Sequence, residues 1–66
     1  MAIRIFRKKS NMTQAAVADA LGVDQTTVSK WEKGEALPRA DTLIKLADLF
    51  NCTVDELLKR PADNKR

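Results

Sequence analysis

The feature that most constrains the fold is a glycine set between two short segments of helical periodicity. Residues 13–21 and 24–33 each repeat apolar residues at helical spacing, and only a Leu-Gly-Val-Asp link lies between them. A turn of three or four residues sets two helices at roughly 90–120°. Gly22 permits the positive φ that such a turn needs, and the small Ala18 lets the helices approach closely. We therefore expect two short helices that cross at a steep angle.

Helical periodicity continues on both sides of this pair. Five helices are expected, over residues 2–9, 13–21, 24–33, 40–50 and 53–58. The expected N-caps are Thr13, Asp24 and Thr53, with Glu56 completing a capping box. The expected C-terminal caps are Gly22, Gly34 and Asn51. No segment alternates with the period of a strand, so the predicted fold class is all-α, a compact five-helix bundle.

None of these helices is long enough to be stable alone in water, so they must share one core. We expect residues 1–60 to form this single domain and residues 61–66 to be a flexible tail. The expected core residues are Ile3, Phe6, Met12, Val17, Ala18, Leu21, Val23, Val28, Trp31, Leu37, Leu43, Leu46, Ala47, Phe50, Val54 and Leu57.

Composition excludes most other classes of protein. A chain of 66 residues with no His and one Cys offers no catalytic base of the usual kind, no metal cluster and no disulfide. We expect no enzyme activity, no cofactor and no small-molecule ligand, and we interpret Cys52 as small filler. No apolar run is long enough to span a membrane and no secretory signal is present, so we expect a cytoplasmic protein. The net charge of +3 is a weak indication of a nucleic-acid partner.

The outward side of the segment 24–33 is unusual in its charge. On a helical wheel Val28, Trp31 and Glu32 share the inner side, which makes Trp31 a core residue rather than a base-stacking one. The outer side carries only small polar or cationic residues, although the chain has nine acids. A helix that enters the major groove of DNA needs such a side, because carboxylates would face phosphates. The outer residues are Thr26, Ser29, Lys30 and Lys33, with Gln25 and Thr27 flanking the first turn.

The sequence resembles the helix-turn-helix of the phage repressor and Cro type, the Xre family, with its lambda-repressor-like fold. The resemblance covers about residues 3–58. The matching residues are Thr13-Gln14, Ala18, Leu21-Gly22-Val23, Val28-Ser29, Trp31-Glu32, Gly34, Pro38, Thr42-Leu43, Leu46-Ala47 and the run from Val54 to Leu58.

This resemblance implies a transcriptional regulator, a repressor by preference, that binds a palindromic operator in double-stranded DNA as a homodimer. Its third helix would lie in the major groove and contact bases through Gln25, Thr26, Thr27 and Lys30. The expected phosphate contacts are Thr13, Gln14, Ser29, Lys33 and Arg39. Gln14 would also brace the start of the third helix. Arg7 and Glu32 are expected to form a structural ion pair.

Other interpretations remain at several positions. Gln25, Thr26 and Thr27 could be ordinary solvated residues, and Arg4, Lys8 and Lys9 are interpreted as a solvated face that adds long-range attraction. Leu49 is expected to be exposed and, with Leu58, to form a dimer patch. The alternative function is a protein-interaction adaptor or antitoxin with the same fold. Such an adaptor would tolerate acids or a large apolar patch on the outer side of the third helix, and this chain has neither there.

Overall fold

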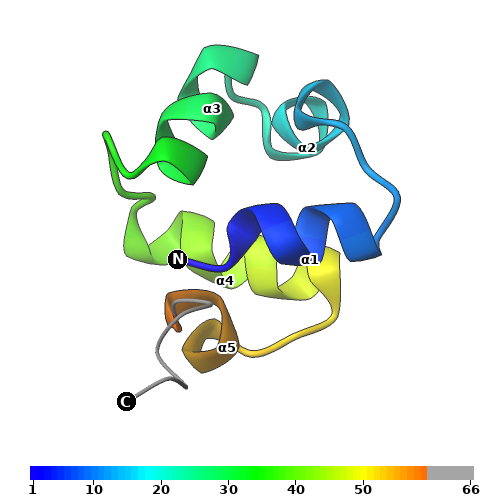
Figure 1. The fold of residues 1–66 in the computed structure, drawn as a ribbon, viewed down its shortest axis with the longest axis vertical. Helices are drawn as coiled ribbons and strands as arrows, with labels where there is room; N and C mark the ends of the chain where they lie inside the picture. The colour runs from blue at the N-terminus through cyan, green and yellow to red at the C-terminus, as the bar shows by residue number, and fades with distance from the viewer. Residues whose placement is uncertain (60–66) are drawn as a thin grey trace.

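A computed structural model describes residues 1–59, and all of its regular structure is helical (Figure 1). The helices are α1 (Ile3–Lys9), α2 (Gln14–Leu21), α3 (Gln25–Lys33), α4 (Ala40–Phe50) and α5 (Val54–Leu58). The predicted all-α, five-helix fold is therefore confirmed, with bounds that agree closely. The tail expected at residues 61–66 lies outside the described residues.

The helices are stacked from one end of the molecule to the other. α2 and α3 lie together at the top of Figure 1, α1 and α4 lie in the middle, and α5 lies below them. The closest packing joins α2 to α3 and α4 to α5. The backbone N–H of Ala2 donates to the carbonyl oxygen of Leu57 at 2.8 Å, so the start of α1 is tied directly to α5.

Four of the helices end in the same way. Gly22 and Gly34 follow α2 and α3 with φ of 72° and 79°, and Asn51 follows α4 with φ of 56°. After each of them the next backbone N–H bonds back five residues, as in a Schellman motif; Glu35 does so to Lys30 at 2.9 Å. These three caps confirm the prediction. Asn11, two residues after the end of α1, has φ of 57° and is followed by the same type of hydrogen bond, from the Met12 N–H to the Arg7 carbonyl oxygen. This cap was not expected.

Two of the three predicted N-caps use their side chains. The Thr13 hydroxyl accepts from the backbone N–H of Ala16 at 3.0 Å. At α5 the backbone N–H of Glu56 donates to the Thr53 hydroxyl at 3.1 Å, and the Thr53 N–H donates to the Glu56 carboxylate at 2.8 Å. Asp24 has the extended backbone of an N-cap but forms no side-chain cap bond.

The core agrees with the predicted list except at two residues: Ala2 is buried but was not predicted, and Leu37 is exposed. The buried apolar residues are Ala2, Ile3, Val17, Ala18, Val28, Trp31, Leu46, Ala47, Phe50 and Leu57. Leu37, which was predicted to be buried, is 76% exposed. It lies in the α3–α4 connection, where no helical period dictates which side chain turns inward. Its neighbours Ala36 and Pro38 turn inward instead.

The prediction that Leu49 is exposed was also wrong. Leu49 is half-buried and packs against the core, because the end of α2 covers this flank of α4. It lines a shallow hollow with Ala20 and Leu21 of α2 and with Lys45. Leu58 is 50% exposed, so only one half of the expected patch reaches the surface.

Candidate nucleic-acid interface

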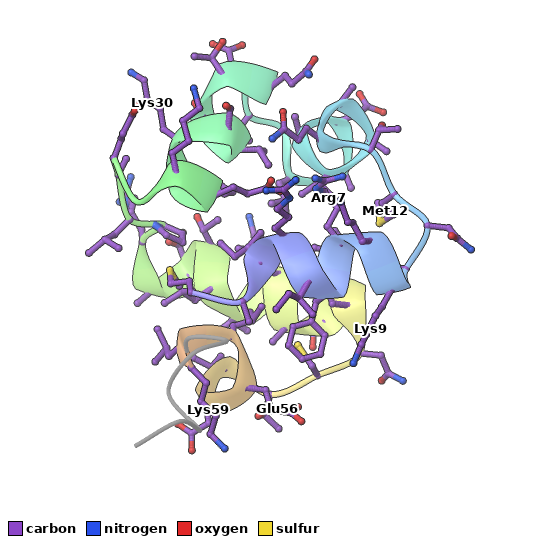
Figure 2. The ribbon with its side chains drawn as sticks, in the orientation of Figure 1. Arg7, Lys9, Met12, Lys30, Glu56 and Lys59 are labelled. Atoms are coloured by element: carbon purple, nitrogen blue, oxygen red, sulfur yellow. The ribbon has the colours of Figure 1, made fainter. Side chains whose placement is uncertain are left out.

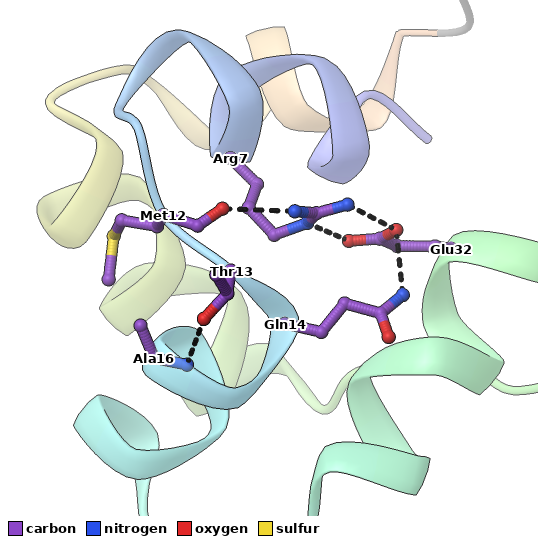
Figure 3. Close-up of polar contacts among 6 residues, drawn as sticks. All are labelled: Arg7, Met12, Thr13, Gln14, Ala16 and Glu32. Atoms are coloured by element: carbon purple, nitrogen blue, oxygen red, sulfur yellow. Dashed lines mark hydrogen bonds and ion pairs between the residues drawn. The ribbon is translucent and has the colours of Figure 1, made fainter.

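An ion pair between α1 and α3 forms the centre of the candidate site (Figure 3). Arg7 Nε donates to Glu32 Oε2 at 2.6 Å, and Arg7 Nη2 donates to Glu32 Oε1 at 3.2 Å. The side chains are 12% and 6% exposed, respectively. Nη1 of the same guanidinium donates to the Met12 carbonyl oxygen at 2.9 Å, in the loop before α2. The pair expected for Arg7 and Glu32 is therefore present, and it is the one salt bridge within residues 1–59.

Gln14, the first residue of α2, binds the same carboxylate. Its Nε2 donates to Glu32 Oε1 at 3.1 Å, so the carboxylate receives donors from α1 and α2 together. Glu32 lies in the last turn of α3. The hydrogen bond of Gln14 thus reaches the last turn of α3, while the same side chain lines a hollow with Gln25 and Thr26 at the first turn, where it was expected to brace the helix.

The surroundings of Glu32 keep it ionised. Burial alone would raise the pKa of this carboxyl group above its usual value of 4.5. Hydrogen bonds from Arg7 and Gln14, with the positive charges of Arg7 and Arg4, outweigh that cost and lower the pKa. Glu32 therefore carries a full negative charge at neutral pH, and Arg7 is electrically balanced.

A polar hollow of about 260 Å³ opens beside this ion pair. It draws side chains from three helices, and three of its residues are cations. The lining residues are Arg4, Arg7, Gln14, Ser29, Glu32 and Lys33. One carboxylate against three cations leaves an excess of two positive charges, which suits an anionic ligand.

A second hollow of about 260 Å³ adjoins the first and carries no charge. It is lined by Gln14, Gln25, Thr26 and Ser29. Gln14 and Ser29 belong to both hollows, so one polar surface runs along α3 from its first turn to its last. The structure thus brings together five of the nine residues expected to contact DNA.

The other four expected contacts lie apart from these hollows. Lys30 is exposed on α3 and points away from the body of the molecule (Figure 2). Thr27 is half-buried, and the Thr13 hydroxyl caps α2. Arg39 is exposed at the start of α4 and forms no side-chain cap bond there.

Arg4 is the functional candidate that the sequence analysis missed. It was placed among solvated cations, yet it lines the charged hollow and helps to lower the pKa of Glu32. A signal was available, because residues three apart lie on one side of a helix and Arg4 precedes Arg7 by three. The partner element α3 could not be inferred from that spacing.

Within residues 1–59, no group of three His, Cys, Asp or Glu residues is placed to hold a metal ion. None of the five helices has both the length and the apolar character needed to cross a membrane. Trp31 is 6% exposed, which confirms that it is a core residue.

Comparison with known proteins extends these observations. The helix-turn-helix family model matches residues 3–57. The cryptic phage CTXphi transcriptional repressor RstR of Vibrio cholerae is 42% identical over 59 residues, which cover 89% of this chain and 53% of that repressor. The HTH-type transcriptional regulator AnsR of Bacillus subtilis is 44% identical over 55 residues, 83% of this chain and 47% of that regulator.

A third relative is itself a phage repressor. Repressor protein C2 of Salmonella phage P22 is 39% identical over 57 residues, which cover 86% of this chain and 26% of that repressor. These matches confirm the resemblance inferred from the sequence. The chain spans about half or less of the length of these three relatives.

Proposed function

The chain belongs to the helix-turn-helix family, and from this premise we propose that it binds operator DNA and regulates transcription as a repressor. The observation that carries the proposal is the outer side of α3, which has Lys30 and Lys33 and no acid among nine in the chain. The names of its relatives, two repressors and a transcriptional regulator, support the same function. In this proposal the domain is a cytoplasmic binding module and not an enzyme.

In the proposed complex, α3 enters the major groove and reads the base edges. Gln25 and Thr26 lie at its first turn, where a recognition helix comes closest to the bases. An amide side chain can pair bidentately with adenine, and a lysine can donate to guanine. The proposed base contacts are Gln25, Thr26, Thr27 and Lys30.

Phosphates flank this helix on the polar surface that Gln14 and Ser29 share. Gln14 uses one amide N–H on Glu32, and an amide nitrogen carries a second. Lys33 adds a positive charge at the other end of α3. The proposed phosphate contacts are Thr13, Gln14, Ser29, Lys33 and Arg39.

Two copies are proposed to bind one palindromic operator. A single module of this size buries roughly 600–1,000 Å² of its own surface on DNA, which is small for tight specific binding. A homodimer doubles this area and matches the two-fold symmetry of a palindrome. The exposed Leu58 remains a candidate for the contact between protomers.

The proposal is tested by selecting bound duplexes from a random DNA pool. The expected result is a palindrome with half-sites about one helical turn apart, bound by two protomers. Titrations of that site and of a scrambled duplex then give the specificity ratio. Failure to enrich any sequence, with equal affinity for both duplexes, would overturn sequence-specific regulation and favour the adaptor or antitoxin alternative.

A further inference from the structure

We propose that Arg4 is a ligand of a DNA phosphate and forms, with Lys33, an anion clamp that extends the DNA-contacting surface from α3 onto α1. This inference rests on the proposed function and deepens it. It adds a helix to the interface and a residue that the helix-turn-helix pair does not contain.

The clamp is defined by the hollow that both cations line. Arg4 comes from the first turn of α1, and Lys33 comes from the last turn of α3. Between these helices lies the Arg7–Glu32 pair, which holds α1 against α3 (Figure 3). A side chain of the first helix is thereby held beside the recognition helix, although the two residues are far apart in sequence.

The balance of charge assigns the anion to Arg4 and Lys33. Glu32 is satisfied by Arg7 and Gln14, and it neutralises the charge of Arg7. Within residues 1–59 neither Arg4 nor Lys33 takes part in a salt bridge. The two uncompensated charges of the hollow therefore belong to these residues, and both are exposed to an incoming ligand.

The effect of Arg4 on Glu32 agrees with this placement. The positive charge of Arg4 is one of the influences that lower the pKa of the Glu32 carboxyl group. This effect agrees with the position of Arg4 in the lining of the charged hollow, where its side chain is exposed to solvent and to an incoming anion.

The path of the DNA backbone follows from the two adjoining hollows. In the proposed complex, a strand whose bases meet Gln25 at the first turn of α3 runs with its backbone past Gln14 and Ser29 into the charged hollow. A phosphodiester there would meet neutral donors first and then the two cations. A guanidinium matches phosphate oxygens bidentately, so Arg4 is better suited to grip one oxygen pair than a lysine would be.

The test compares Arg4→Gln with the matched variant Lys45→Gln. Lys45 is exposed on α4 and lines a different hollow, so its loss removes the same charge from another surface. Affinities for the selected operator and for a scrambled duplex are measured at several salt concentrations. Arg4→Gln is expected to weaken the affinities for the two duplexes by the same factor. It should also reduce the slope of log affinity against log salt concentration by about 0.9 per protomer, the value of one phosphate contact. Lys45→Gln is expected to leave the slope unchanged.

The outcomes separate this inference from the function on which it rests. If the parent, Arg4→Gln and Lys45→Gln showed equal salt dependence of their affinity, the clamp would be overturned, but the proposal of DNA binding would remain. Equal losses in both variants would also overturn the clamp, because the effect would then be long-range charge alone. A parent that binds neither duplex would overturn the function, and the clamp with it. Arg4→Lys, which keeps the charge, is expected to keep the slope, and thermal melts of all variants show that the fold is intact.

Discussion

Arg7 and Glu32 are 25 residues apart in the sequence, and two guanidinium nitrogens of Arg7 bind the Glu32 carboxylate at 2.6 and 3.2 Å. Gln14 donates to the same carboxylate at 3.1 Å, so one side chain of α3 is held by both α1 and α2. The orientation of α3 therefore depends on a polar contact as well as on the core.

Replacing Arg7 with Met should destabilise the fold, because Glu32, whose side chain is only 6% exposed, would lose its counter-charge. We expect a loss of about 3 kcal/mol in the free energy of unfolding, the lower end for breaking a buried pair. A chain of this size has roughly 3–10 kcal/mol in total. Urea unfolding followed by circular dichroism measures the loss.

Glu32→Gln provides the milder comparison for this pair. The amide removes the charge but can still accept a hydrogen bond from Arg7. It should lose less stability than Arg7→Met. An Arg7→Met protein as stable as the parent would show that the ion pair contributes nothing to folding.

Acidification should weaken the contribution of Glu32 to stability. Its pKa in the folded protein is lower than the usual 4.5, so the unfolded chain binds the proton more readily. The contribution is complete above the unfolded value and is lost as the pH falls through the lower folded-state pKa. The difference in unfolding free energy between the parent and Glu32→Gln should therefore be constant near pH 7 and shrink below pH 4.5. A difference that grows on acidification would contradict the direction of this pKa shift.

Lys30 and Lys33 should differ in what they contribute to DNA binding. Both lie in the last turn of α3, but Lys30 projects away from the body of the molecule, whereas Lys33 lines the charged hollow. Lys30→Ala is expected to cost about 1–3 kcal/mol on the operator and to relax preference at one base pair per half-site. Lys33→Ala should weaken all sequences equally and reduce the salt slope by about 1 per monomer.

Titrations on operator and scrambled DNA at several salt concentrations separate the two roles. If both variants lose the same factor on both duplexes, Lys30 does not read bases. Specificity would then rest on Gln25, Thr26 and Thr27.

At the left-handed helix caps, the effect of a substitution on stability should depend on the backbone angle φ and not on steric crowding of the new side chain. Gly34 has φ of 79°, and a Cβ added there would meet no atom within 4 Å. Gly34→Ala should therefore cost about 1 kcal/mol from backbone strain alone. Asn51→Gly, at φ of 56°, relieves a similar strain and should cost little or be stabilising. A loss of several kcal/mol at Gly34 would point to a packing role instead.

The amino-acid sequence by itself determined the helices, their ends and most of the core. Thr13, Gly34 and Thr53 act through bonds to residues at most five positions away, so local spacing is enough to predict them. The Arg7–Glu32 pair was expected from the family resemblance. The helical wheel agreed with it, because it placed Glu32 on the inner side of its helix, where a charge needs a partner.

The tertiary structure alone decided which surfaces these helices share. Leu37 is exposed because of the path of the α3–α4 connection. Leu49 is half-buried because the end of α2 covers it. Arg4 lines the charged hollow only because α1 lies beside α3. Helical periodicity gives the angle of a residue about its own axis, whereas the neighbour it meets depends on how whole helices pack, which no short-range pattern encodes.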